Sequence, residues 1–131
     1  MKAELGFVGK PETPAIRKAV HKFVAFPEVA GHPTGGAVDI RILDPKGNIV
    51  DMGTGIHVLN ENSFTLSPFV SPEAWQNRQI LRICMTSAGY APFDGEWWHF
   101  SYGDREWAAY YRQPHSLYGL AELPAKARKA A

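Results

Sequence analysis

Glycine and proline interrupt this sequence so often that only short helices and strands can form between them. The chain holds 12 glycines and 10 prolines among its 131 residues, about a sixth of the total, where about 12% is usual. Proline fixes φ and removes a backbone donor, and glycine adopts turn conformations that other residues avoid. We therefore expect turns and ordered loops to make up much of the fold.

The composition is that of a folded protein without a strong electrical bias. Hydrophobic residues make up 45% and charged residues 21%, and 14 Lys and Arg against 13 Asp and Glu leave a net charge of +1. Such a balance offers no field that would attract nucleic acid or an anionic membrane, so we expect neither partner. The length fits one domain over residues 1–131, with 1–12 as a loose lead-in and 124–131 as a frayed tail.

The cysteine content and the lengths of the apolar runs indicate the cellular compartment to expect for this protein. Cys84 is the sole cysteine, which excludes an intramolecular disulfide and a paired-thiol zinc or redox site. The apolar runs fall short of the roughly 18–20 residues of a membrane helix, and no apolar segment follows the first residues as in a signal peptide. We expect a soluble, cytoplasmic protein.

Two segments have the pattern of helices. Thr13-Pro14 is typical of a helix start, and apolar residues at helical spacing predict a helix over residues 14–26. Ser71-Pro72-Glu73 begins a stronger helix, which should end at Gly89. The predicted buried stripe of the second helix consists of Leu81, Cys84, Met85 and Ala88.

Two further pairs of segments have the pattern of β-hairpins. The expected strands are residues 37–43 with 49–52, and residues 96–102 with 106–112. A turn signal lies between the members of each pair, and residues 53–70 read as a long irregular loop. This order predicts an α+β domain, with an antiparallel sheet of about four strands and helices packed on one side.

Two short clusters hold the residues best suited to chemistry. One runs from His32 to Asp39, and the other is Glu96-Trp97-Trp98-His99. Together they supply two imidazoles and two carboxylates, the donor types of a catalytic zinc site with three protein ligands. The turn at Gly35-Gly36 would allow a histidine before it and an aspartate after it to reach one point. This pattern predicts a zinc site at the sheet.

The spacing within the second cluster restricts where Glu96 lies. Residues three apart point to opposite faces of a regular strand, so Glu96 and His99 converge only if Glu96 lies in the preceding turn or a bulge re-aims one side chain. We favour the turn, which would place Glu96 near the reacting water as a base. Each pair alone is a weak signal, and ordinary hydrogen-bonded polar residues are the simpler alternative. Burying such groups without partners costs several kcal/mol, which favours a shared cation.

Four blocks of the sequence carry a resemblance to a known family. They are His32-x-x-Gly35-x-Ala37-x-Asp39, Asp51-Met52-Gly53-Thr54, Asn77-Arg78 and Glu96-Trp97-Trp98-His99. In order and approximate spacing, from Val24 to Tyr111, they resemble the D-alanyl-D-alanine dipeptidases of the vancomycin-resistance type. The resemblance implies that His32, Asp39 and His99 bind Zn²⁺ and that Glu96 is the catalytic base. It also implies zinc-dependent hydrolysis of a short peptide, a D-amino-acid dipeptide, on an antiparallel sheet with flanking helices.

The chain departs from the family pattern in three places. The family's oxyanion-stabilising arginine lies well upstream of the first zinc histidine; here 31 residues precede His32, and Arg17 is the nearby candidate. His57 stands where the family has an aspartate that holds the substrate's ammonium group, and Ala30 stands where it has a serine. His57 and Trp97 are the candidate substrate contacts.

These departures leave other functions open beside the peptidase. The chain could be a catalytically impaired relative that binds zinc or peptide. The peptidase itself is expected to be an N-terminally shortened family member. Alternatively, the chain could be the downstream half of a split enzyme, in which a second chain or another copy supplies the missing segment. In a further alternative, His57 closes the open position of the zinc ion.

Overall fold

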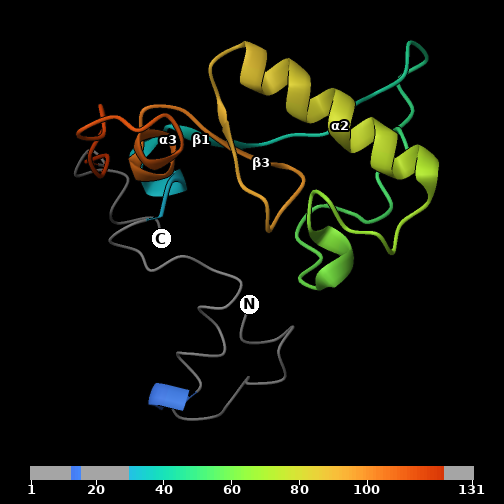
Figure 1. Ribbon diagram of the computed structural model, residues 1–131, viewed down its shortest axis with the longest axis horizontal. Helices are drawn as coiled ribbons and strands as arrows, with labels where there is room; N and C mark the ends of the chain where they lie inside the picture. The colour runs from blue at the N-terminus through green and yellow to red at the C-terminus, as the bar shows by residue number, and fades with distance from the viewer. Residues whose placement is uncertain (1–12, 16–29, 123–131) are drawn as a thin grey trace. The chain divides into compact units, whose positions relative to one another are not determined.

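The computed structural model describes residues 13–15 and 30–122 (Figure 1). The chain divides after Ala30, and the elements described below lie in the unit Gly31–Ala131. Pro14 and Ala15 are helical, in agreement with the start of the helix predicted over 14–26. The rest of that helix, Arg17, the lead-in 1–12 and the tail 124–131 lie outside the described residues. A single domain over residues 1–131 stays a prediction.

The described strands form one small antiparallel sheet. Its strands are β1 (Ala37–Asp39), β2 (Ala91–Pro92) and β3 (His99–Ser101), in the order β1-β3-β2. In the register between β1 and β3, Asp39 lies opposite His99. The predicted α+β class with an antiparallel sheet is therefore confirmed, although the sheet of the described residues has three strands, fewer than the four expected.

The first predicted hairpin is shorter than expected. Residues 37–43 were expected as one strand, but the ladder with β3 ends at Asp39. The return segment 49–52 is joined to it by a single bridge between Leu43 and Ile49. The turn between them forms as predicted, because the Asp44 carboxylate accepts hydrogen bonds from the backbone of Lys46 and Asn48 at 2.8 Å each. Residues 43–49 therefore form a turn that is closed by this bridge, and residues 49–52 do not add a fourth strand to the sheet.

The second predicted hairpin is wrong, because residues 106–112 do not form a strand. Helix α3 (Arg105–Tyr110) takes the place of that strand. Asp104 is its N-cap, and Asp104 Oδ1 accepts a hydrogen bond from the backbone N–H of Trp107 at 2.9 Å. The aromatic residues of this segment favour a strand. The Asp104 carboxylate favours a helix, because it accepts a hydrogen bond from a backbone N–H of the first helical turn that has no partner within the helix.

Helix α2 (Pro72–Ser87) confirms the stronger helix prediction. The Ser71 side chain accepts a hydrogen bond from the backbone N–H of Ala74 at 3.1 Å, and Gly89 follows the end of the helix at φ 86°. The predicted buried stripe is partly wrong, because Cys84 and Ala88 are exposed. The buried positions of this helix are Ala74, Arg78 and Leu81, spaced by four and three residues.

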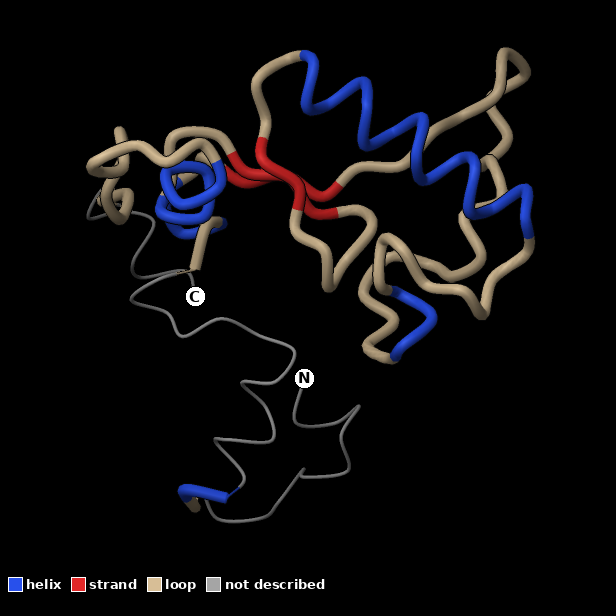
Figure 2. Tube along the Cα trace, viewed as in Figure 1, coloured by secondary structure: helices blue, strands red, loops and turns tan. Residues whose placement is uncertain are grey.

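The core unites α2 with the sheet and the loop before the helix. Its buried cluster consists of Met52, Leu81, Trp97, Trp98 and Phe100. The predicted irregular loop 53–70 contains one short 3₁₀ helix, η2 (Glu61–Ser63), and loops form much of the described chain (Figure 2). None of the described helices has the length and apolar character needed to cross a membrane.

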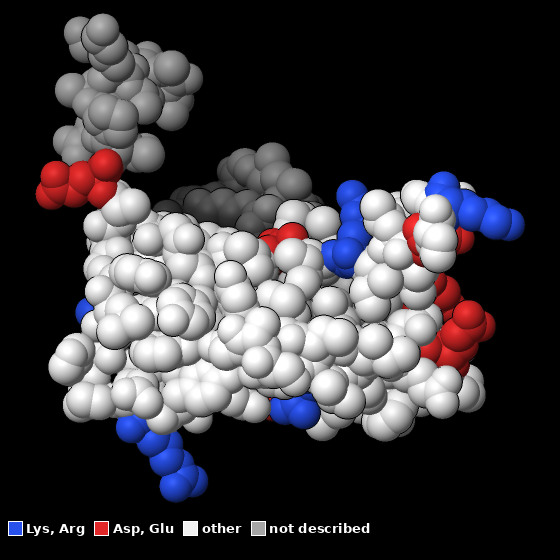
Figure 3. All heavy atoms as spheres, turned by 90° about the horizontal axis from the view of Figure 1, so that it is seen from above, with Lys and Arg blue, Asp and Glu red and all other residues white. Residues whose placement is uncertain are grey.

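One face of the molecule carries charged groups of both signs (Figure 3). On the face shown in Figure 3, basic and acidic side chains are scattered, mainly near the edges, and most of the area between them is uncharged. This distribution agrees with the near-zero net charge of the sequence.

Candidate metal centre

A tight turn brings His32 to the start of the first strand. His32 opens the short 3₁₀ helix η1 (His32–Thr34), which ends at Gly35 in the left-handed conformation, φ 75°. A side chain at Gly36 would collide with the carbonyl oxygen of Tyr102, which lies against this turn. Glycine is therefore needed at position 36 for close approach and favoured at position 35 by its φ. The turn returns the chain into β1, as the sequence predicted.

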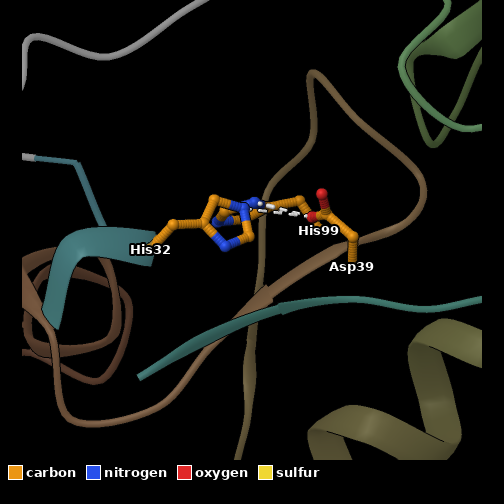
Figure 4. Close-up of side chains that lie close together, drawn as sticks. All are labelled: His32, Asp39 and His99. Atoms are coloured by element: carbon orange, nitrogen blue, oxygen red, sulfur yellow. Dashed lines mark ion pairs between the residues drawn. The ribbon is translucent and has the colours of Figure 1, made fainter. Parts of the chain in front are cut away.

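The antiparallel register then brings His99 to the same point. Asp39 Oδ1 lies 3.2 Å from His32 Nε2 and 3.3 Å from His99 Nδ1 (Figure 4). One ligand atom from each of the three residues can be chosen so that all lie within 4.8 Å of one another. The structure thus gathers the three side chains that the sequence predicted as metal ligands.

The burial and the contacts of Asp39 Oδ1 show whether these donors fit a zinc ion. This oxygen is buried and has no hydrogen-bond partner among the described residues, although two ring nitrogens lie beside it. Two ligands bound to one tetrahedral zinc ion at about 2.0–2.1 Å lie about 3.3–3.4 Å apart, close to the two spacings found here. Two imidazoles and a carboxylate are also a donor set that zinc accepts. The three residues therefore fit Zn²⁺.

Glu96 lies beside the ligands in the turn before β3. Its backbone N–H donates to the carbonyl of Phe93 at 3.2 Å and closes a turn at Asp94-Gly95, where the sequence placed this residue. Glu96 Oε2 lies 3.9 Å from His99 Nδ1, and the Glu96 side chain is 18% exposed. Burial raises the pKa of the Glu96 carboxyl, and this effect outweighs the opposing charge of His99. The group is thus a stronger base than an exposed glutamate.

The other side of the His99 ring contacts residues that the sequence analysis missed. His99 Nε2 lies 3.2 Å from Glu106 Oε2 and 3.3 Å from Ser101 Oγ. Burial lowers the pKa of His99, but the hydrogen bond and charge of Glu106 outweigh it and raise that pKa. The same hydrogen bond lowers the pKa of Glu106. Asp104 followed by two charged residues could have signalled the helix start that brings Glu106 here.

His57 reaches the site from the long loop. Its Nε2 lies 3.0 Å from Asp39 Oδ2, whereas the other two histidines lie beside Oδ1 of the same carboxylate. The ring is 65% exposed and contacts Trp98 edge-on. His57 adopts φ 63°, a left-handed conformation that is uncommon outside glycine. The three-residue metal cluster does not include His57, which contacts one of its members from outside.

Trp97, the other candidate substrate contact, lies in the core. It is 2% exposed, and its indole nitrogen donates a hydrogen bond to Thr54 Oγ1 at 2.9 Å. A role for Trp97 in substrate binding stays a prediction. Two arginines of the described region are engaged elsewhere, since Arg78 bonds to backbone carbonyls and Arg82 faces Asp94 at 3.6 Å.

Comparison with known proteins identifies the family. The family model described as D-ala-D-ala dipeptidase matches residues 6–119, which is most of the chain. This chain belongs to the D-Ala-D-Ala dipeptidase family. The predicted resemblance is therefore confirmed, and the residues gathered in Figure 4 lie within the matched region.

Individual relatives agree with this assignment. The chain is 41% identical to the D-alanyl-D-alanine dipeptidase of Escherichia coli K12 over 71 residues, 54% of this chain and 37% of the relative. It is 42% identical to the D-alanyl-D-alanine dipeptidase of Synechocystis over 95 residues, 64% of this chain and 38% of the relative. An Enterococcus faecium protein of the same name is 33% identical over 73 residues, 54% of this chain and 36% of the relative. The chain thus spans well under half the length of these relatives.

Proposed function

We propose that this chain hydrolyses a short peptide, a D-Ala-D-Ala-like dipeptide, in a zinc-dependent reaction with Glu96 as the base. The observation that carries the proposal is the gathering of His32 and His99 around the unpartnered Oδ1 of Asp39, with Glu96 beside them. The substrate class is supported by the family model and by the names of the relatives.

In the proposed reaction, the zinc ion and Glu96 have separate roles. When bound by His32, Asp39 and His99, a zinc ion supplies a Lewis acid for the scissile carbonyl and makes water a stronger acid. Glu96 accepts a proton from the attacking water and passes it to the nitrogen of the leaving amino acid. Its position in the turn beside β3 keeps the carboxylate close to the ligands while leaving it free to move this proton.

We assign His57 to the substrate side of the site. Its exposed ring stands beside Asp39 and presents an imidazole where the family pattern has a carboxylate. An imidazole does not attract an ammonium group, so the favoured substrate would carry a blocked amino end or a carboxylate near His57. Comparing the rate for free D-Ala-D-Ala with that for its N-acetyl form tests this assignment, and a preference for the free dipeptide would contradict it.

A single pair of variants tests the proposed hydrolysis. Glu96→Gln keeps the size of the side chain but cannot accept the proton, so kcat should fall by about 10²–10⁴-fold. Zinc content, measured by elemental analysis, should remain near one ion per chain. Glu73→Gln makes the same change on the exposed first turn of α2 and should leave both quantities unchanged. Equal rates of alanine release in the Glu96→Gln and Glu73→Gln proteins would contradict the role of Glu96.

A second candidate function is zinc or peptide binding without hydrolysis. It is favoured by the contact between His57 Nε2 and Asp39 Oδ2, which brings a third imidazole beside the proposed metal ligands. A zinc-loaded wild-type chain that binds dipeptides but releases no alanine would support it. Release restored by a co-expressed upstream segment would instead indicate a split enzyme. Action in the cytoplasm stays a prediction.

A further inference from the structure

The second nitrogen of the His99 imidazole has its own set of partners. His99 Nδ1 faces Asp39 Oδ1 at 3.3 Å, whereas His99 Nε2 faces Glu106 Oε2 at 3.2 Å. Ser101 stands between these groups: its hydroxyl donates to Glu106 Oε2 at 3.2 Å and lies 3.3 Å from His99 Nε2. The ring therefore lies between the metal-binding side and a carboxylate.

These contacts determine which nitrogen carries the proton. A neutral imidazole has one N–H and one lone pair, and a carboxylate can only accept a hydrogen bond. Because Glu106 faces Nε2, the proton belongs on Nε2 and the lone pair on Nδ1. The lone pair is then directed toward the point that Asp39 Oδ1 and His32 Nε2 share. His99 would be a poor ligand in the opposite tautomer.

The surroundings leave the His99 ring little freedom to rotate out of this arrangement. Its side chain is 8% exposed, and Ser101 is completely buried. The His32 ring lies edge-on to it at 4.7 Å between centroids, and Phe93 lies edge-on at 5.9 Å. Packing limits the movement of the ring, but it does not determine which of the two nitrogens carries the proton. The hydrogen bond to Glu106 does.

We propose that Glu106 is a positioning residue of the metal centre, which acts through His99 by holding Nδ1 free for the ion. Glu106 does not belong to the three-residue ligand cluster. It reaches His99 because Asp104 starts α3 two residues earlier. Outer carboxylates on metal-binding histidines generally increase metal affinity by about 10–100-fold. This inference rests on the proposed metal centre and adds a residue that the ligand set does not contain.

Zinc affinity of the full chain tests this role. The dissociation constant is measured by competition with a chromophoric chelator for the wild type, Glu106→Gln and Glu106→Ala. Glu106→Ala leaves Nε2 without its acceptor and should bind zinc about 10–100-fold more weakly. Glu106→Gln keeps an oxygen that can accept the Nε2 proton, so its affinity should lie between the other two. Glu122→Gln, an equal charge change at an exposed position, should bind like the wild type.

A second measurement separates positioning from a general loss of stability. Long-range ¹H–¹⁵N spectra of the zinc-loaded protein report which nitrogen of His99 bears the proton. We expect a slowly exchanging Nε2–H in the wild type and a broadened or shifted one in Glu106→Ala. If Glu106→Ala does not fold, the zinc affinity and the Nε2–H signal of Glu106→Gln are compared with those of the wild type instead, and values equal to the wild type in both would contradict the role of Glu106.

The outcomes distinguish this inference from the function on which it rests. A wild-type chain that binds no zinc would overturn the metal centre itself. A wild type that binds zinc, with Glu106→Ala within twofold of it, would overturn only the role of Glu106. An unchanged Nε2–H signal in Glu106→Ala would do the same.

Discussion

Asp39 is the residue on which the contacts of the site converge. Its two carboxylate oxygens face different neighbours: Oδ1 faces His32 and His99, and Oδ2 faces His57. The residue comes from the last position of β1, where it pairs with His99 across the sheet. A carboxylate at this position can bind an ion through one oxygen while the other is held by a hydrogen bond.

Part of the candidate site could be predicted from the sequence, since the structure gathers His32, Asp39 and His99 as expected. The turn at Gly35-Gly36 indicated that His32 and Asp39 could meet, whereas the roles of His99 and Glu96 came from the family resemblance. Glu106 and the contact of His57 with Asp39 were not identified. Both depend on where a helix or a long loop places a side chain relative to the sheet, which the residue types alone do not specify.

Arg78 is a buried charge whose role is structural, and it leads to a prediction about stability. The residue is 0% exposed, and its guanidinium donates to the backbone carbonyls of Met52 at 2.7 Å and Phe64 at 2.8 Å. Burial lowers its pKa. Arg78→Met should leave both carbonyls without this donor and reduce the free energy of unfolding by about 2–4 kcal/mol.

Urea denaturation of the metal-free protein measures this change. Arg41 lies on the exposed part of the first hairpin, and Arg41→Met should change stability by no more than about 0.5 kcal/mol. If Arg78→Met were as stable as Arg41→Met, the two carbonyl contacts would not hold the loop against α2.

At the level of the elements, the helices and strands differ in how far the sequence determined them. Helix α2 was predicted to within a residue or two because its cap and its terminating glycine are local signals. Its buried face was predicted only in part, because the prediction followed the apolar residues alone. Arg78, a charged residue, is buried in the core and was not expected there. The strands are three residues or fewer, so pairing with distant segments decided their length.

The N-cap of α3 gives a prediction at this level. Asp104 Oδ1 accepts the hydrogen bond from Trp107 N–H, and the residue is buried. Asp104→Ala removes the cap and should lower the free energy of unfolding by about 1 kcal/mol, within the range of about 0.5–2 kcal/mol for such caps. Asp104→Asn keeps a capping oxygen and should lose less.

The control for this cap is an exposed aspartate. Asp94 faces Arg82 at 3.6 Å with most of its side chain in solvent, so Asp94→Ala should have little effect. Thermal unfolding followed by circular dichroism compares the three variants. A loss in Asp94→Ala as large as that in Asp104→Ala would show that the cap contributes nothing specific.

Across the whole described region, the four blocks of the family resemblance are in contact with one another. Asn77 donates to the carbonyl of Asp51 at 2.8 Å, and the indole of Trp97 donates to Thr54 at 2.9 Å. The blocks that do not bind the proposed ion therefore fix the core next to those that do. This explains why the blocks together indicate both a fold and a site, while each pair of residues alone indicates little.

The proposed ligand residues also link distant parts of the chain, so zinc bound by them should stabilise the fold. His32 precedes β1, and His99 begins β3, 67 residues later. An ion that binds the folded form only, at a free concentration about 100 times its dissociation constant, adds about 2.7 kcal/mol, which for a chain of this length raises Tm by about 10 °C. The shift is measured by calorimetry with zinc and with excess chelator. His32→Ala removes an exposed ligand and should abolish the shift, and an equal shift in that variant would exclude the ligand set of Figure 4.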